Sequence, residues 1–594
     1  MNEKSIFALF QVVCDENPDK VAYRHKDGDT WIPLTWKQSY DINKRIAKSL
    51  IALGVQKGDK VNILSHTRLE WSQCDLATVS IGAVTVGIYP TNLADECAYI
   101  INHSEGVVLF VENREQLEKV LSVRNDLPKL RHIIIIDGSV GENEPAMTWQ
   151  QFWDKADETT EKVCMERTEA VQPEDLATIV YTSGTTGVPK GAMLTHNNIL
   201  FSSWNVCECL PINAEMETVM FLPLAHIFAR LTVYSAMRAR LIVAFAQSVQ
   251  TLVEDIKEVQ PHFFASAPRV YEKIYEKVTS DVQLAGGMKK KIFDWALATG
   301  YAVSKLLQNH QPIPGGLRIK NSIAHKLVFS KLHKALGGRI QTCVSGAAPL
   351  NKDIAEFFHA FGILILEGIG MTENTSFTNV NRVDRYKFGS VGLLGDKIEE
   401  KLAEDGELLC RGPHVMAGYY KDPEGTAEAI DEDGWLHTGD ICTIDNDGFL
   451  YVTDRKKDLI ITSGGKNIAP QRIERIIRSS HFVSQVLAIG DKRKFVSALV
   501  SLNRPDVEIW ATQHGMDIGE WDEFVQTQAV QNLIQSEIDR CNRELASYET
   551  VKKFRIIPHE FSIDSGEMTP TLKLKRNVIT ANYKSLIDSM YEGV

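Results

Sequence analysis

The chain has 594 residues, 44% of them hydrophobic and 24% charged, a composition that supports several buried cores and predicts more than one domain. Its net charge of -12 argues against nucleic-acid binding as a main task. No apolar run approaches the about 18 residues of a membrane-spanning helix. The apolar opening segment 5–14 runs into acidic residues without a cleavage site, which predicts an amphipathic helix rather than a secretion signal.

The ten cysteines are scattered along the chain and form no CxxC pair. This spacing predicts free thiols in a reducing cytoplasm and disfavours a structural zinc site. We therefore expect a cytoplasmic protein, and we leave open a peripheral contact with the inner membrane surface. The oligomeric state is also left open, with a homodimer as one alternative.

The first part of the chain alternates β-branched runs with helical stretches such as residues 36–53. This alternation is typical of parallel α/β sheets. The runs that predict strands are residues 61–64, 83–88, 106–111 and 132–137.

Residues 181–191 form the most informative segment, because four Ser or Thr side chains, three glycines and Lys190 occur within eleven residues at the end of a predicted buried strand, 177–181. Glycines allow a tight turn whose N–H groups face anionic oxygens, and the hydroxyls add donors, so the segment predicts a phosphate-binding loop. Pro189 stands where the common P-loop requires glycine, which excludes that motif. A solvated Gly/Thr turn is the alternative. The loop residues expected to bind are Thr182, Ser183, Gly184, Thr185, Thr186, Gly187 and Lys190.

Residues 289–339 form a basic region with ten Lys or Arg and one acidic residue, Asp294, in a chain that is acidic overall. In its second half, apolar residues that include Leu327 and Leu332 are expected to share one helical face, which ends at a glycine pair, 337–338. An ordinary surface helix explains this pattern. A transient contact with anionic lipid is the alternative.

The character of the sequence changes after Asp440, where residues 441–453 predict a hairpin followed by a charged cluster at 454–458. Beyond it we expect a helix at 471–480 and strands at 483–489 and 496–502. This pattern places a domain boundary within the charged cluster and predicts a large α/β domain, residues 1–455, and a small α+β domain, residues 456–594.

The segment from Tyr181 to Leu194 resembles the phosphate loop of the adenylate-forming superfamily, which includes acyl-CoA synthetases. Six further segments resemble motifs of that superfamily and follow in its order: 345–350, 370–373, 406–408, 434–440, 454–458 and 463–470. Within the superfamily, residues 222–228, 268–273 and 569–576 look most like those of long-chain fatty-acyl-CoA synthetases. The resemblance implies a large N-terminal domain and a smaller, mobile C-terminal lid.

The resemblance also implies how ATP is bound. The loop with Lys190 would hold the β- and γ-phosphates, Glu373 would bind Mg²⁺ together with Thr185, and Thr372 would contact the α-phosphate. Lys573 would be the lysine that assists adenylation. A helix-capping carboxylate is the alternative role for Glu373.

For the nucleoside, the resemblance places Asp440 on the ribose hydroxyls, with Arg455 as a second ribose or phosphate contact. A turn aspartate and a surface ion pair are the alternatives. Ile369 stands where the family usually has a tyrosine stacked on adenine, so that contact is absent. The base would rest on Ile369 and on neighbouring backbone; the further positions assigned to the nucleotide are Gly346, Ala347, Ala348 and Gly370.

On the acyl side, His226 and Arg230 fall in the segment that borders the substrate tunnel in the family, and Arg230 replaces the tryptophan gate of some bacterial relatives. A satisfied core histidine is the alternative for His226. Lys457 matches the hinge of the C-terminal domain. Gly464 and Gly465 would let the pantetheine arm of CoA pass, unless they form only a loop turn.

These observations predict an enzyme that converts a long-chain fatty acid and ATP to acyl-AMP and pyrophosphate, and then transfers the acyl group to CoA. The expected cofactors are ATP, Mg²⁺ and CoA as co-substrate. The alternatives are a ligase that loads a carrier protein, a CoA ligase for aromatic or alicyclic acids, and a catalytically silent adenylate-binding regulator.

Overall fold

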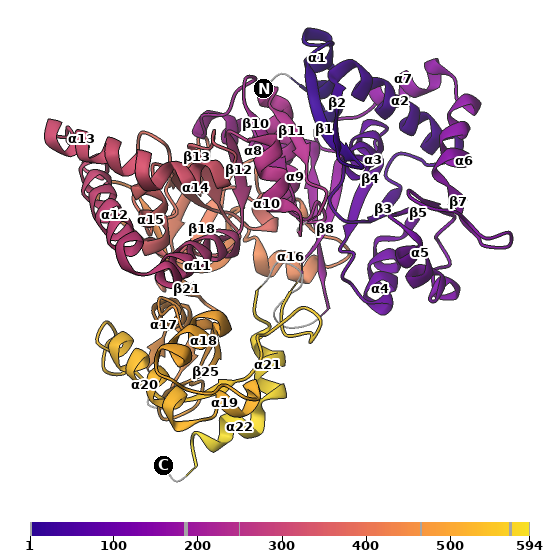
Figure 1. The fold of residues 1–594 in the computed structure, drawn as a ribbon. Helices are drawn as coiled ribbons and strands as arrows, with labels where there is room; N and C mark the ends of the chain where they lie inside the picture. The colour runs from indigo at the N-terminus through magenta and orange to yellow at the C-terminus, as the bar shows by residue number, and fades with distance from the viewer. Residues whose placement is uncertain (1–2, 183–187, 249, 464–465, 570–572, 593–594) are drawn as a thin grey trace.

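The structure is a computed structural model that describes residues 3–182, 188–248, 250–463, 466–569 and 573–592. Figure 1 shows a large N-terminal part, coloured indigo to orange, and a smaller C-terminal part in yellow, which lies below α11 and α16 in this view. No helix among the described residues is long and apolar enough to cross a membrane.

The first sheet is built mainly from parallel strands and carries the predicted phosphate loop at one edge. Its neighbours β8 and β9 are antiparallel and enclose that loop. In spatial order the sheet contains β19 (Gly418–Tyr419), β9 (Lys190–Thr195), β8 (Leu176–Thr182), β4 (Val84–Ile88), β3 (Lys60–Leu64), β5 (Gly106–Val111), β6 (His132–Ile135) and β7 (Met147–Thr148).

The second sheet has a parallel centre with antiparallel strands at both edges. In spatial order it contains β16 (Leu393–Leu394), β15 (Asn379–Val380), β14 (Leu364–Ile369), β13 (Thr342–Ser345), β12 (Phe263–Ser266), β10 (Glu217–Met220), β11 (Ile242–Phe245), β1 (Val21–Asp27) and β2 (Thr30–Thr35). The parallel pairs confirm the α/β class expected from the alternating pattern.

Helices between the strands bury their apolar faces against these sheets. The helix α2 begins at a capping box, in which the side chains of Thr35 and Gln38 bond each other's backbone N–H, and it buries Trp36 fully. The main helices of this part are α1 (Ile6–Glu16), α2 (Trp36–Ala52), α3 (Leu69–Ser80), α4 (Ala94–Ser104), α5 (Arg114–Leu121), α6 (Trp149–Asp154), α7 (Glu161–Glu169), α8 (His196–Cys209), α9 (Ile227–Ala239), α10 (Leu252–Val259), α11 (Pro268–Ala285), α12 (Gly287–Gln308), α13 (Gly315–Ala324), α14 (Ser330–Ala335), α15 (Lys352–Ala360) and α16 (Pro423–Ala429).

A third, antiparallel sheet leads from the large domain to the C-terminal domain. Its last two strands are the hairpin expected after Asp440, and Gly448 takes a positive φ of 85° at the turn. The strands are β17 (Glu399–Leu402), β18 (Glu407–Arg411), β20 (Leu436–Ile444) and β21 (Leu450–Arg455).

The C-terminal domain has its own core around a three-stranded sheet, with both expected strands at their expected bounds. A third strand, β26, pairs parallel with β25 and was not expected, because Lys552, Lys553 and Arg555 interrupt its apolar pattern. Its elements are α17 (Pro470–Ile477), β24 (Val483–Ile489), β25 (Val496–Leu502), α18 (Arg504–Gln513), α19 (Trp521–Phe524), α20 (Gln528–Asn542), β26 (Val551–Ile557), α21 (Arg576–Asn582) and α22 (Lys584–Ser589).

The helical segment of the basic region differs from its prediction. A π-helical turn, His325–Phe329, joins α13 to α14 and changes the helical periodicity at this point. Leu332 is buried, whereas Leu327 is 47% exposed, so the two residues do not share one helical face as predicted.

Candidate active site

The predicted site residues come from both domains and meet near the carboxyl end of β14. Thr372 and Glu373 lie on a short 3-10 turn after this strand, Asp440 and Arg455 lie on the β20–β21 hairpin, and Lys573 enters from the C-terminal domain. The pKa values of Asp440 and Lys573 each reflect the charge of the other, and Glu373 also acts on Lys573. The structure therefore brings these five residues together.

At the phosphate loop, Thr182 and Lys190 face each other as the last pair of the β8–β9 hairpin. The Thr182 hydroxyl lies 3.5 Å from the Lys190 carbonyl oxygen. The predicted binding residues Ser183, Gly184, Thr185, Thr186 and Gly187 lie outside the described residues.

The side chain of Lys190 is held by a segment that the sequence analysis did not single out. Its ammonium lies 2.8 Å from the Asp422 carboxylate and 5.1 Å from the centre of the Tyr419 ring. Asp422 is the N-cap of α16, where it also accepts a bond from the Gly425 N–H. A Cβ at Gly425 would clash with both the Lys190 ammonium and the Asp422 carboxylate, so a larger residue here would force the ion pair to shift.

Glu373 is connected to the same segment. The Tyr419 hydroxyl donates to the Glu373 carboxylate at 2.7 Å, and the Met416 N–H donates to the Glu373 carbonyl oxygen at 2.8 Å. Both Thr372 and Glu373 are buried. Tyr419 thus contacts the proposed phosphate lysine through its ring and the proposed metal-binding carboxylate through its hydroxyl.

Asp440 and Arg455 are directly paired across the β20–β21 hairpin, and the Arg455 Nε donates to the Asp440 carboxylate at 2.8 Å. Burial raises the pKa of Asp440, while the Arg455 guanidinium and the Lys573 ammonium act in the opposite direction. The charge of Asp440 raises the pKa of Arg455. The pair thus offers a carboxylate acceptor beside a fixed cation.

Lys573 projects from the segment between β26 and α21, where its backbone N–H donates to the Thr569 hydroxyl at 3.0 Å. Its side chain remains accessible, yet the surrounding protein lowers its pKa to about 8 by desolvation and by the nearby Arg455 guanidinium. Asp440 and Glu373 partly oppose this shift. An ammonium with a lowered pKa between carboxylates is the environment expected of a functional lysine.

His226 caps the N-terminus of α9, where its Nδ1 accepts a bond from the Phe228 N–H at 3.2 Å. Burial, followed by the charges of Lys573 and Arg230, lowers the pKa of His226 to about 4. The imidazole is therefore neutral at pH 7, and because Nδ1 accepts, Nε2 carries the proton.

Arg230 is placed differently from the tunnel position that the sequence suggested. It is only 1% exposed, and its guanidinium donates to Asp75 at 3.3 Å and stacks 5.5 Å from the Trp71 ring. It does not line the cavity described below. The reason is geometric, since Arg230 occupies the face of α9 opposite to Phe228 and Thr232, which line the cavity.

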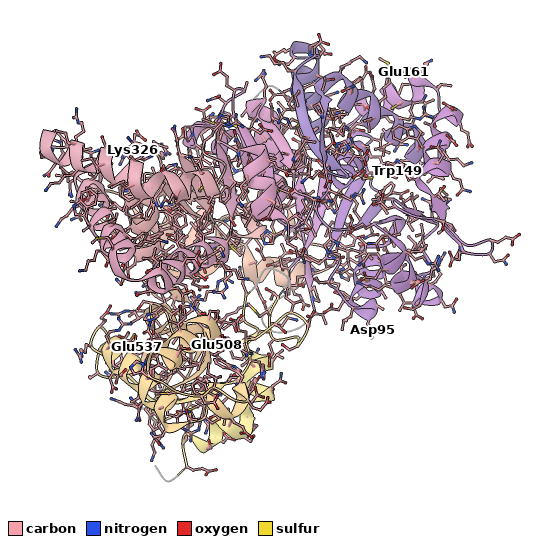
Figure 2. All side chains as sticks on the ribbon, in the orientation of Figure 1. Asp95, Trp149, Glu161, Lys326, Glu508 and Glu537 are labelled. Carbon is pink, nitrogen blue, oxygen red and sulfur yellow. The ribbon has the colours of Figure 1, made fainter. Side chains whose placement is uncertain are left out.

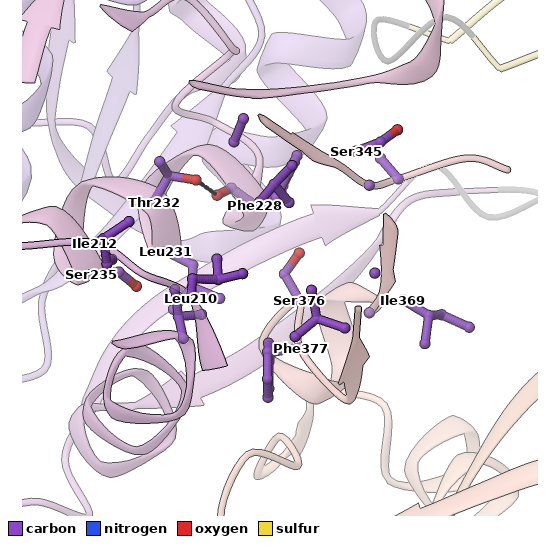
Figure 3. A pocket seen from close by; sticks show the side chains of 18 of the residues that line it. Leu210, Ile212, Phe228, Leu231, Thr232, Ser235, Ser345, Ile369, Ser376 and Phe377 are labelled. Atoms are coloured by element: carbon purple, nitrogen blue, oxygen red, sulfur yellow. Dashed lines mark hydrogen bonds between the residues drawn. The ribbon is translucent and has the colours of Figure 1, made fainter. Parts of the chain in front are cut away.

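An apolar cavity lies between α8, α9 and the second sheet. In Figure 3, Ser345 and Ile369 lie at one end, beside the site, and Leu210, Ile212 and Ser235 lie at the other. Its main apolar side chains are Leu210, Ile212, Phe228, Leu231, Phe263, Val344, Phe377 and Val380.

The positions predicted for adenine lie at the near end of this cavity. Gly346, Ala347, Ile369 and Gly370 line it, whereas Ala348 is exposed and does not. A Cβ at Gly370 would overlap the backbone of Ser376, which explains the glycine there.

At the predicted hinge, Lys457 is exposed, and the preceding Lys456 bonds back to Asp405 at 2.6 Å and to Glu407 at 2.9 Å. Gly464 and Gly465 lie outside the described residues. The hinge role of Lys457 and the pantetheine role of the glycine pair therefore stay predictions.

The C-terminal domain contacts α11 through polar groups that sequence reasoning missed. Two of these contacts border a second cavity between α11 and α17. The contacts join Arg269 to Ser484 at 3.3 Å, Glu272 to Arg478 at 3.8 Å, and Ser280 to Asp506 at 3.0 Å. Their signal in the sequence is weak, because charged residues at helical spacing are typical of any solvent-exposed helix.

Comparison with known proteins identifies the family. The model described as AMP-binding enzyme matches residues 10–420, and the AMP-binding enzyme C-terminal domain matches residues 457–594. The chain is 34% identical to the long-chain-fatty-acid–CoA ligase FadD15 of Mycobacterium bovis, over 97% of this chain and 95% of that protein. It is also 34% identical to the long-chain-fatty-acid–CoA ligase ACSBG2 of Xenopus laevis, over 99% and 84%.

Among solved structures, the anthranilate CoA ligase AuaEII in complex with anthranoyl-AMP superposes with a TM-score of 0.74 at 21% identity, covering 99% of this chain and 98% of that one. At this identity the likeness establishes the fold alone. It confirms the large α/β domain with a smaller C-terminal domain, and the family models confirm the resemblance drawn from the motifs.

Proposed function

The chain belongs to the AMP-binding enzyme family, and on that premise we propose that it is a long-chain fatty acid–CoA ligase. The observation that carries this proposal is that Lys573, Asp440, Arg455 and Glu373 act on one another's charge directly after Ile369 and Gly370, which line one end of an apolar cavity. The two long-chain-fatty-acid–CoA ligases to which the chain is 34% identical support long-chain fatty acids as the substrate class. In the first step a carboxylate oxygen bonds to the α-phosphorus of ATP and pyrophosphate leaves.

This step joins two anions, so the site must offset negative charge without blocking the α-phosphorus. Lys573 supplies an ammonium whose pKa responds to the nearby charges of Asp440 and Glu373, and there it can contact the fatty-acid carboxylate and the α-phosphate together. Lys190 supplies a second ammonium at the edge of the phosphate loop. The neutral His226 adds an N–H donor without adding charge.

Mg²⁺ fits the described residues through Glu373, whose buried carboxylate is held by the Tyr419 hydroxyl. A single protein carboxylate suits this ion, which commonly keeps water and substrate phosphates as its other ligands. When bound, the ion would neutralise phosphate charge. Thr185 is the second proposed ligand and belongs to the loop at residues 183–187.

For the acyl chain, we assign the cavity beside Gly346 and Gly370. Its walls come from α8, α9 and four strands, and the apolar side chains at its far end match the tail of a long-chain acid better than a polar acid. The nucleoside would lie at the near end, with its ribose on Asp440 and its base on Ile369.

In the second step the CoA thiolate attacks the acyl carbonyl carbon and AMP leaves. We assign Lys457 as the hinge for rotation of the C-terminal domain between the steps, with Gly464 and Gly465 facing the pantetheine arm afterwards. In the arrangement described here, Lys573 lies near Arg455, Asp440 and Glu373 of the large domain, which supports a role in the adenylation step.

The proposal is tested with a panel of carboxylic acids assayed with ATP and Mg²⁺, with and without CoA. We expect hexadecanoate and octadecanoate to yield the CoA thioester, AMP and pyrophosphate. Thioester from benzoate but from neither long-chain acid would refute the substrate class. Pyrophosphate exchange without any thioester would instead indicate an acyl-AMP ligase that loads a carrier protein.

A further inference from the structure

The hairpin formed by α12 and α13 exposes an unusual concentration of apolar side chains. Of the twenty large hydrophobic residues that the described part of the chain leaves exposed, nine lie between residues 284 and 327. Figure 1 shows these helices at the edge of the large domain that is farthest from α6 and α7. Scattered apolar residues on a surface need no explanation, but a concentration of this kind within neighbouring helices indicates a candidate interaction site.

The group is most regular on α13 and the π-helical turn that follows. Ile319, Ile323 and Leu327 are spaced four residues apart and are 65%, 46% and 47% exposed. The opposite face is buried through Ala324 and Phe329. The helix therefore already packs against the protein through one face, and its apolar stripe is a second face that has no partner in the described chain.

Cations flank this stripe. Arg318, Lys320 and Lys326 are exposed, and Lys326 is labelled at the outer edge in Figure 2. Of the ten Lys and Arg between residues 289 and 339, only Lys290 and Arg339 form an ion pair with another described residue. The remaining positive charge is not neutralised locally, although the whole chain has a net charge of -12.

We propose that this outer face, defined by Ile319, Ile323 and Leu327 with Arg318, Lys320 and Lys326, docks on the surface of a bilayer that contains anionic lipid. An apolar stripe flanked by cations suits the boundary between headgroups and acyl chains, where the stripe is buried and the cations meet lipid phosphates. The charge disfavours a second copy as the occupant, since a two-fold interface would bring the same cations face to face. A nucleic acid would leave the apolar stripe without a role.

The experiment measures binding of the full-length protein to vesicles in the absence of substrates, so its result does not depend on the proposed ligase activity. Vesicles of phosphatidylcholine are compared with vesicles of equal parts phosphatidylcholine and phosphatidylglycerol. Two triple variants are tested: Ile319→Ser/Ile323→Ser/Leu327→Ser, and Arg318→Gln/Lys320→Gln/Lys326→Gln. The control, Val163→Ser/Met165→Ser, removes exposed apolar side chains from α7, near Glu161 in Figure 2.

We expect wild type and control to bind the anionic vesicles and not phosphatidylcholine alone. Each cation removed should weaken partitioning about fivefold, which corresponds to ~1 kcal/mol, so the charge variant should lose about a hundredfold. The apolar variant should also lose at least about tenfold, because membrane burial of its side chains is lost. Unchanged thermal unfolding of both variants would show that the fold is intact, since the altered side chains are exposed.

Three results would overturn the proposal. Equal binding to both vesicle types would remove the role of anionic lipid. Binding that depends on the cations but is unchanged in the apolar variant would identify a general polyanion surface. A wild-type dimer that the apolar variant converts to a monomer, with no change in vesicle binding, would assign the stripe to a second copy of the chain.

Discussion

Replacing Lys573 with alanine should separate the two half-reactions of the proposed ligase. The Lys573 ammonium lies among Asp440, Arg455 and Glu373, and its pKa is lowered to about 8 mainly by desolvation. In this position it can orient the two reacting anions and offset the charge that develops as the new bond forms. Removing one preorganised donor of this kind commonly slows a step by ~10² to 10³, and we expect Lys573→Ala to lose acyl-AMP formation by about that factor.

The second half-reaction should be far less affected, because the proposed rotation of the C-terminal domain carries Lys573 away before CoA attacks. Pyrophosphate exchange measures the first step, and presynthesised acyl-AMP with CoA measures the second. Lys575→Ala is the matched control, since Lys575 is two residues away and the Lys575 N–H bonds to the Glu567 backbone at the start of α21.

Two outcomes would refute this reasoning. Equal losses in both half-reactions would mean that Lys573 is structural or that the domain does not rotate. A larger loss in Lys575→Ala than in Lys573→Ala would assign the adenylating role to the other lysine.

Three further predictions concern the same site. Because the lowered pKa of Lys573 places its protonated form below about pH 8, kcat/KM for adenylation should be constant below that pH and fall as pH rises through it; a profile that is flat to pH 10 would contradict a role for the ammonium. Ile369→Tyr should tighten ATP binding by no more than about tenfold, or ~1.4 kcal/mol, through stacking on adenine, as measured by ATP titration; a strong loss of affinity would show that the base lies elsewhere. Glu272→Gln removes the partner of Arg478 at the C-terminal end of α17. It should slow pyrophosphate exchange by a few fold, roughly the effect of ~0.5 to 1 kcal/mol, without slowing thioester formation from acyl-AMP. Glu254→Gln on α10 is the control, and equal effects of both variants would exclude a specific contact between Glu272 and the C-terminal domain.

Local patterns in the sequence predicted most of the strands and helices discussed here. The strands 483–489 and 496–502 agree with β24 and β25 because uninterrupted β-branched runs specify them. The strand β26 was not predicted, because three basic residues interrupt the apolar pattern by which a strand is recognised. The exposure of Leu327 could not be predicted either, since a regular period of 3.6 residues does not anticipate a π-helical turn.

In the candidate site, too, contacts set by a local pattern could be predicted, whereas contacts between distant segments could not. The juxtaposition of Asp440 and Arg455 follows from the hairpin, whose turn the sequence indicates. The contacts of Tyr419 and Asp422 join segments that are more than two hundred residues from Lys190, and no local pattern specifies such a pairing. For Arg230 the motif position was misleading, although helical spacing alone places it opposite Phe228 on α9.

The C-terminal domain, which carries Lys573, contacts α11 through weak polar interactions. Weak contacts between the domains would allow one site to serve two reactions. The described contacts between α11 and the C-terminal domain are single polar pairs, with Glu272 and Arg478 as far apart as 3.8 Å. Polar interfaces of this kind exchange protein partners for water at little cost, so relative motion is the default expectation. The buried cores lie within each domain instead, around Trp36 and Trp71 in one and around Val500 and Ile534 in the other. A rotation about the segment at Lys457 would therefore break a few partly buried polar pairs and leave both cores intact, which is the condition under which Lys573 can leave the site after acyl-AMP forms.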